Sequence, residues 1–163
     1  KYAQRKSVKY DAMIVENGLV NAFTIVGGSV FIHTGLLDFV ENEEQLAFVL
    51  GHEIAHNELK HCIYGIQYTL LASQVDPIFG EVVSVAYSLY NVPFAKQDEY
   101  EADDLGLQLM TQAGYEKNTA YSFFEKLHNL EAEYNKNADP LNDFIASHAS
   151  AQKRKERLQE KYK

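Results

Sequence analysis

Residues 43–56 read EEQLAFVLGHEIAH, and this stretch decides the fold and indicates the chemistry of the chain. Glu43 and Glu44 stand at its beginning, where the positive end of a helix dipole favours negative charge. Apolar residues recur through the stretch at helical spacing, at Leu46, Val49, Leu50 and Ile54. The sequence therefore predicts a helix from about residue 43 to about residue 61.

Within this predicted helix, His52-Glu53-Ile54-Ala55-His56 forms an HExxH motif. Residues four positions apart share one face of a helix, so both imidazoles can bind a single Zn²⁺. Glu53 follows His52 directly and can reach a water molecule on that metal as a general base. We therefore expect one Zn²⁺ per chain, with His52 and His56 as ligands and Glu53 as the catalytic residue.

Two imidazoles do not complete a catalytic zinc site, which usually has three protein ligands and a water molecule. In the metzincin pattern, the third ligand is a His six residues after the second histidine of the motif, and a Gly stands three residues after that histidine. Leu59 and Cys62 occupy these two positions here, so the chain does not have this pattern. His61 lies five residues beyond His56, about 140° around a helix. We expect it to point away from the metal, either at the surface or packed in the interior.

The stretch Glu99-Tyr100-Glu101-Ala102-Asp103 lies near the start of a second predicted helix, about residues 98–112. Glu99 and Asp103 share a face of that helix. We expect Glu99 to be the third zinc ligand and Asp103 to accept a hydrogen bond from a ligand imidazole. Two alternatives stay open: the acidic residues form only a solvated helix start, or Glu99 is not a ligand and the site is incomplete.

Short strands precede these helices, and further helices follow them. Residues rich in β-branched and aromatic side chains predict strands at about 8–16, 21–26 and 29–33. A stripe of apolar residues predicts a third helix with Asn118 or Thr119 as its cap, and C-terminal helices over about 119–163. We expect a polar loop at 135–142 and a solvated terminal helix at 153–163. The fold class is therefore α+β, mostly helical with a small N-terminal sheet.

Composition excludes several classes of protein. A chain of 163 residues with 46% hydrophobic content can bury one core, so we expect a single domain over residues 1–163. The net charge of −8 opposes binding to nucleic acid. Cys62 is the single cysteine, which excludes an internal disulfide. The longest runs without charged residues, 61–75 and 82–95, are too short to span a bilayer. The chain begins at Lys1 without an apolar leader, so we expect an upstream segment.

Several motifs together resemble the gluzincin-type zinc metallopeptidases, the family of the CAAX prenyl protease, the HtpX heat-shock protease and the periplasmic BepA-like proteases. The matches before and within the first helix are Asn21-Ala22-Phe23, Gly27-Gly28, Val30-Phe31-Ile32, Gly35-Leu36-Leu37, Gly51 to His56 and Lys60-His61. Those after it are Glu99 to Asp103, Gly106 and Ala113-Gly114-Tyr115. The resemblance implies a zincin-like metallopeptidase domain that carries an HExxH active-site helix.

The resemblance also implies roles for residues outside the metal group. Asn21, Ala22 and Phe23 would form an edge strand to which an extended substrate adds through main-chain hydrogen bonds. His148 or Arg154 would donate to the oxyanion of the reaction if the C-terminal helix folds back over the site. His148 would otherwise occupy a fourth zinc position and keep the enzyme idle. The implied location is extracytoplasmic, in the periplasm or at a membrane.

Two functions follow from this pattern. The first is a zinc endopeptidase that hydrolyses unfolded or misassembled proteins, a quality-control role that rests on the resemblance. The second is a latched or inactive zinc-binding module, chaperone-like, that binds partners without hydrolysing them. Residues 66–95 are predicted to form a helical hairpin that serves as an active-site cover, a dimer surface or a surface for a membrane or envelope complex.

Overall fold

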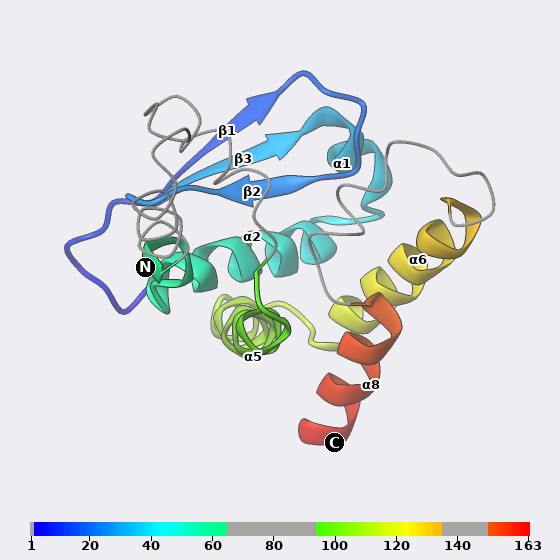
Figure 1. Ribbon diagram of the computed structural model, residues 1–163. Coiled ribbons are helices and arrows are strands. Elements are labelled where there is room, and N and C mark those ends of the chain that lie inside the picture. Colours follow the sequence, from blue (N-terminus) through cyan, green and yellow to red (C-terminus); the bar gives the residue numbers. More distant parts are fainter. Residues whose placement is uncertain (1, 65–93, 135–149) are drawn as a thin grey trace, which may run out of the picture.

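The computed structural model describes residues 2–64, 94–134 and 150–163 (Figure 1). Its strands are β1 (Asp11–Val15), β2 (Ala22–Thr24) and β3 (Ser29–His33). Its helices are α1 (Thr34–Phe39), α2 (Glu43–Glu58), α5 (Lys96–Gln112), α6 (Asn118–Tyr134) and α8 (Ala151–Lys161). The prediction of an α+β fold that is mostly helical with a small N-terminal sheet is confirmed.

The three strands form one sheet in the order β1-β3-β2. β1 pairs with β3 in parallel, and β2 pairs with β3 in antiparallel, with Phe23 opposite Phe31. Between β2 and β3 the chain turns at Gly27 and Gly28, whose φ angles of 108° and 100° are favourable only for glycine. Because β3 lies between β1 and β2, β2 is an edge strand of the described sheet. The predicted strands lie where the sequence placed them, although β1 and β2 are shorter than the predicted ranges.

The helix with the HExxH motif begins as predicted and ends three residues early. Asn42 caps its start, because the Asn42 side chain accepts a hydrogen bond from the backbone N–H of Gln45 at 2.9 Å. At the other end, Lys60 adopts a left-handed conformation with φ 66°, which stops the α-helix. Helix α2 therefore ends at Glu58, and His61 does not continue its helical spiral.

Helix α2 lies between the sheet and α5 (Figure 1). It crosses α5 at two glycines. A Cβ atom on Gly51 would lie 2.8 Å from the carbonyl oxygen of Gly106, and a Cβ atom on Gly106 would lie 2.8 Å from the backbone nitrogen of His52. No side chain fits there, so the two backbones touch. This close crossing brings the histidines of α2 against the acidic face of α5.

Helices α6 and α8 complete the core. Phe48 of α2 packs against Phe123 and Phe124 of α6, and Leu158 of α8 is fully buried in the same cluster. The predicted terminal helix is present, but the expectation that it is merely solvated is wrong. One face of α8 is buried at Ala151, Arg154 and Leu158, because these residues recur every three or four positions.

Two sequence predictions concern residues that lie wholly or mostly outside the ranges that the structure describes. The polar loop at 135–142 lies wholly outside the described residues, and so does nearly all of the predicted hairpin at 66–95. Within the ranges that the structure describes, no helix has the length and apolar character that crossing a bilayer requires. That the chain is one domain stays a prediction.

Candidate metal centre

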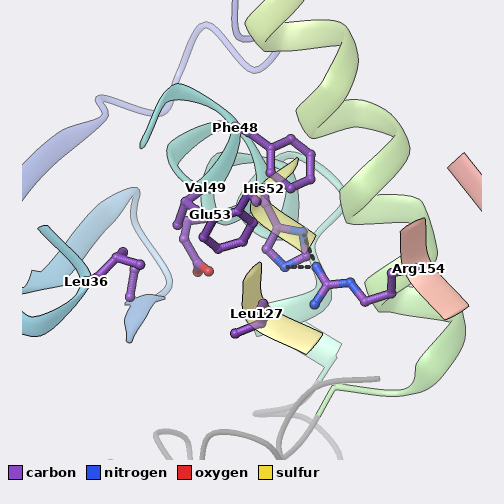
Figure 2. Close-up of a pocket in the computed structure, with 9 residues that line it drawn as sticks. Leu36, Phe48, Val49, His52, Glu53, Leu127 and Arg154 are labelled. Carbon is purple, nitrogen blue, oxygen red and sulfur yellow. Dashed lines mark hydrogen bonds between the residues drawn. The ribbon is translucent and has the colours of Figure 1, made fainter. Parts of the chain in front are cut away.

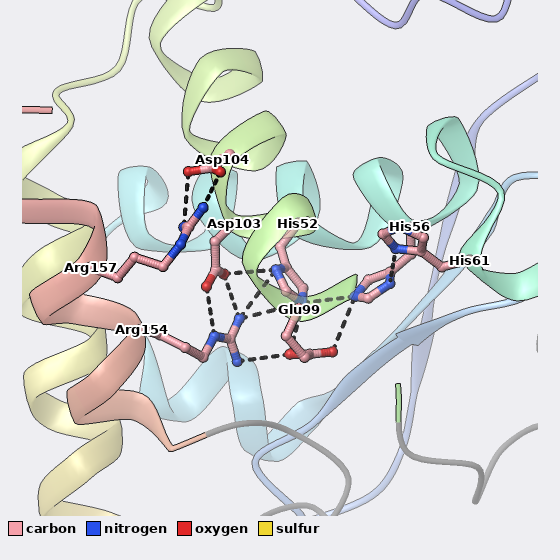
Figure 3. A network of polar contacts seen from close by, with 8 residues as sticks. All are labelled: His52, His56, His61, Glu99, Asp103, Asp104, Arg154 and Arg157. Carbon is pink, nitrogen blue, oxygen red and sulfur yellow. Dashed lines mark hydrogen bonds and ion pairs between the residues drawn. The ribbon is translucent and has the colours of Figure 1, made fainter. Parts of the chain in front are cut away.

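Three buried side chains from two helices converge on one point. His52 and His56 come from α2 and Glu99 from the first turn of α5, and each is 4% exposed or less. Their nearest ring nitrogens, Nε2 of both histidines, are 3.0 Å apart. The Glu99 carboxylate lies 3.4 Å from Nε2 of His56 and 3.7 Å from Nε2 of His52 (Figure 3). The structure therefore brings together the three residues that the sequence nominated as zinc ligands.

The donor set and its spacing fit Zn²⁺. Ligand atoms bonded at 2.0–2.1 Å to a tetrahedral zinc ion lie about 3.4 Å from one another. The three separations here, 3.0, 3.4 and 3.7 Å, bracket that value. All three residues can offer ligand atoms within 4.8 Å of one another. Among the described residues, two imidazoles and one carboxylate make up the group, which is a ligand set of catalytic zinc sites.

A second carboxylate fixes the outer side of His52. Oδ1 of Asp103 lies 3.0 Å from Nδ1 of His52, the ring nitrogen opposite the one that faces Glu99. A hydrogen bond from Nδ1–H to Asp103 makes the lone pair of Nε2 available to a metal. Asp103 therefore lies where it can accept a hydrogen bond from the His52 imidazole, as the sequence predicts. Its role in supporting a metal ligand stays a prediction.

Arg154 of α8 joins the two acidic residues. Its Nη2 lies 2.6 Å from Oδ1 of Asp103, its Nε lies 2.8 Å from Oδ2 of Asp103, and its Nη1 lies 3.1 Å from Oε2 of Glu99 (Figure 3). Arg154 is only 4% exposed. The contacts therefore support a role in holding the carboxylates, whereas the predicted contact of Arg154 with substrate stays a prediction.

Burial and charge set the protonation of the group. Burial lowers the pKa of His56 to about 3, and burial together with the Arg154 charge lowers the pKa of His52. Burial alone would raise the pKa of Asp103, but the charge of Arg154 and its hydrogen bonds lower it. The imidazoles are therefore neutral and Asp103 is ionised at pH 7, which is the state that binds a metal cation.

Glu53 differs from the other acidic residues of the site. Burial raises the pKa of Glu53 well above 4.5, and the negative charge of Glu99 raises it further. An acid with a raised pKa is suited to accept and return a proton near neutral pH. Its position next to His52 on α2 is the one that the HExxH spacing predicts.

A pocket opens beside Glu53 (Figure 2). Its polar lining consists of His52, Glu53 and Arg154. Its apolar lining consists of Ala22, Leu36, Phe48, Val49, Phe123 and Leu127. Ala22 belongs to β2, the edge strand that the sequence analysis nominated for substrate binding. A pocket of this kind can hold an apolar group next to the candidate catalytic residue.

The other nominated substrate residues lie on or beside the same strand. The carbonyl oxygen of Asn21 accepts a hydrogen bond from the backbone N–H of His33 at 3.0 Å. The ring of Phe23 stacks on the ring of Phe31 with centroids 4.8 Å apart. Both residues therefore contact β3. Their predicted contact with a substrate backbone stays a prediction. His148, nominated as an oxyanion donor or fourth ligand, lies outside the described residues.

Sequence reasoning missed two residues beside the metal group. His61 is buried, 4% exposed, so the surface alternative for it is wrong. Its position is not the one that a continued helix would give, because the left-handed turn at Lys60 ends α2 before His61. His61 lies beside His56 and is not one of the three candidate ligands among the described residues. Phe94 stacks on the ring of His56 with centroids 3.8 Å apart, and no sequence pattern marks it. The spacing of Ala151, Arg154 and Leu158, by contrast, marks an arginine on a buried helix face.

This chain is similar in sequence to known proteins over most of its length. Residues 1–162 match the model of Peptidase family M48. A mitochondrial metalloendopeptidase OMA1 of Arabidopsis thaliana is 30% identical over 94% of this chain and 32% of its own length. The Schizosaccharomyces pombe OMA1 is 31% identical over 94% of this chain and 47% of its own length.

A bacterial protease with a different name is also similar to this chain. The beta-barrel assembly-enhancing protease of Escherichia coli (strain K12) is 26% identical over 77% of this chain and 30% of its own length. The chain thus spans about a third to a half of the curated relatives it matches. The His52, His56 and Glu99 group is of the His/His/Glu kind typical of zinc peptidases of the matched family.

Proposed function

Because this chain belongs to peptidase family M48, we propose that it is a zinc-dependent endopeptidase that hydrolyses peptide bonds with Glu53 as general base. The observation that carries the proposal is the buried convergence of His52, His56 and Glu99, with ligand atoms within 4.8 Å of one another, beside the pocket that Glu53 lines. Peptide substrates follow from the family.

His52, His56 and Glu99 would hold the zinc ion. Zinc in such a site supplies Lewis-acid chemistry, which acidifies a water molecule and polarises a peptide carbonyl. The carboxylate of Glu53 accepts the proton of the attacking water and returns it to the leaving nitrogen. Asp103 keeps Nδ1 of His52 protonated, so that Nε2 faces the metal position. Arg154 holds Asp103 and Glu99 in place with a buried positive charge.

We infer that the substrates are unfolded or flexible polypeptides. β2 is an edge strand of the described sheet, and an extended segment can add to an edge strand through main-chain hydrogen bonds. Ala22 of β2 also lines the pocket, so a chain bound along β2 would pass close to Glu53. An unfolded or flexible polypeptide can present such an extended segment. A role in protein quality control is the further proposal that follows.

We propose an extracytoplasmic or organellar location for the chain. The names of the OMA1 relatives state that those proteins are mitochondrial. The support for this location is therefore the similarity to proteins outside the cytosol. Fractionation of cells that express the natural protein tests it, and recovery in the soluble cytosol would contradict it.

Cleavage of casein, an unfolded protein, by the zinc-loaded chain tests the catalytic proposal. Glu53→Gln should abolish cleavage while zinc stays bound, because the amide cannot accept the proton of water. Glu43→Gln is the matched control, an exposed change on the same helix that should leave the rate unchanged. A chelator should stop cleavage, and added zinc should restore it. Equal cleavage by Glu53→Gln would disprove the mechanism.

The latched alternative makes a different prediction in the same assay. If His148 closes the site, the parent chain binds zinc without cleaving casein, and His148→Ala cleaves it. Cleavage by the parent chain excludes a permanently latched state. Inactivity of both chains with zinc bound would favour a binding module without hydrolysis.

A further inference from the structure

His61 touches the outer side of the second candidate ligand. Its Nδ1 lies 3.1 Å from Nδ1 of His56, the ring nitrogen opposite the one that faces Glu99 (Figure 3). The other nitrogen of His61, Nε2, lies 3.8 Å from Oδ1 of Asp98 and 3.8 Å from Oε2 of Glu101. A continuous row therefore runs from the metal position through His56 and His61 to two carboxylates of α5.

The backbone holds His61 in this place. Lys60 takes the left-handed conformation with φ 66°, its N–H donates to the carbonyl of Asn57 at 3.1 Å, and the N–H of Ile63 donates to the carbonyl of Lys60 at 3.0 Å. This turn directs the His61 side chain back over the end of α2. Phe94 covers the face of the His56 ring at the same time. The His56 ring is thus restrained at its outer nitrogen and at its face.

Hydrogen-bond chemistry allows one consistent arrangement of protons in this row when a metal is bound. Nε2 of His56 must offer its lone pair to the metal, so the proton of the neutral ring stays on Nδ1. Nδ1 of His61 must then accept that proton's hydrogen bond, so the proton of His61 is on Nε2. That proton faces the carboxylates of Asp98 and Glu101, each 3.8 Å away, which is an ion-pair rather than a hydrogen-bond distance. The Nδ1–H of His56 therefore has an acceptor in His61, and the other side of His61 faces negative charge.

We propose that His61 is a positioning residue that orients His56 for zinc, as Asp103 orients His52. The inference rests on the proposed zinc site and adds His61 to the residues that support it.

The carboxylates behind the two histidine ligands differ in exposure. Asp103 is completely buried with Arg154, whereas the side chains of Asp98 and Glu101 are 35% and 46% exposed. The His56 side of the centre is therefore the one whose supporting charges are open to solvent.

The zinc dissociation constant of the whole chain, measured by competition with a chromophoric chelator, tests this role. His61→Leu removes the acceptor and leaves the Nδ1–H of His56 buried without a partner, so zinc should bind about 10–100-fold more weakly. His61→Gln keeps an acceptor oxygen and a donor amide, so its affinity should stay near that of the parent. His128→Leu, on α6, is the matched control for loss of a histidine and should not change zinc affinity.

Thermal unfolding in the presence of a chelator separates positioning from folding. If His61 is only a packing residue, His61→Leu and His61→Gln change unfolding but bind zinc alike, which would overturn the proposal. If His61→Leu does not fold, the double variant Asp98→Asn and Glu101→Gln replaces it. These side chains are partly exposed, and their neutralisation should weaken zinc binding without unfolding the chain. Unchanged zinc affinity in that folded variant would also overturn the proposal.

The same measurements keep this inference apart from the proposed function. A parent chain that binds zinc and cleaves casein, with all His61 variants equal to it in affinity, disproves only the role of His61. A parent chain that binds zinc without cleaving casein disproves the peptidase activity, and the affinity ratios still decide the role of His61. A parent chain that binds no zinc disproves both.

Discussion

The guanidinium of Arg154 forms a bidentate pair with the carboxylate of Asp103, with Nη2 2.6 Å from Oδ1 and Nε 2.8 Å from Oδ2. Its third nitrogen reaches Glu99 at 3.1 Å. One buried cation from the last helix therefore pairs with two buried carboxylates of α5, that of the candidate ligand Glu99 and that of Asp103, which contacts the candidate ligand His52. The C-terminal helix is in this way a part of the metal centre.

Replacing Arg154 by Met should destabilise the chain by about 3–5 kcal/mol, because the change leaves two buried carboxylates without their cation. The loss should be larger with chelator than with zinc, since a bound metal ion replaces part of the lost positive charge. Urea unfolding under both conditions measures this. Arg157→Met is the matched control, since Arg157 on the same helix pairs with Asp104 near the surface and its loss should cost about 1 kcal/mol or less. Equal losses for the two arginines would contradict the argument.

Gly106→Ala should separate the two helices that carry the site. Replacing glycine by alanine inside a helix normally stabilises it by roughly 0.5–1 kcal/mol. Here the new Cβ atom would lie 2.8 Å from the backbone nitrogen of His52, so α2 and α5 must move apart. We expect a lower melting temperature and weaker zinc binding. Gly18→Ala, whose Cβ would have nothing within 4 Å, is the control. A more stable variant with parental zinc affinity would show that the close crossing is not required.

Glu53→Gln should stabilise the metal-free chain, and increasingly so as the pH rises. The pKa of Glu53 is raised from 4.5 in the folded state, so the folded state holds this proton more tightly than the unfolded state does. The contribution of Glu53 to stability is therefore full below pH 4.5 and is lost as the pH rises through the raised pKa.

The amide introduced by Glu53→Gln does not titrate, so the advantage of the variant should grow above pH 4.5, by at most about 1.4 kcal/mol per pH unit. Melting temperatures of both chains in chelator, at about pH 5 and about pH 7.5, measure the effect. A difference between the chains that stays constant with pH would refute the assignment of a raised pKa to Glu53.

Glu99→Gln should weaken zinc binding by more than about 100-fold, which exceeds the effect expected of an outer partner. The reason is that a neutral amide oxygen is a poor replacement for a carboxylate ligand. Chelator competition gives the dissociation constant, and Glu133→Gln on α6 is an exposed control of the same chemistry. Zinc binding as tight as in the parent would mean that Glu99 is not a ligand and that the site is completed by another residue.

Much of the centre was predictable because its members repeat within single helices. His52 and His56 stand four apart, as do Glu99 and Asp103, and each pair shares a face through the geometry of one helical turn. The boundaries of β3, α5 and α6 also followed closely from local patterns of apolar residues, glycines and caps. The candidate third ligand, Glu99, was nominated by charge and spacing, and the structure places its carboxylate 3.4 Å from Nε2 of His56.

The sequence by itself determined which helices form and which residues share a face, because these properties depend on neighbours within a turn or two. The tertiary structure decided what lies opposite those faces. Arg154 meets Asp103, 51 residues away, only because α8 packs on α5, and the helices approach closely only because Gly51 and Gly106 coincide. His61 reaches His56 only because one residue, Lys60, leaves the helical conformation. Contacts of this kind depend on how whole elements pack, and no local repeat in the chain encodes them.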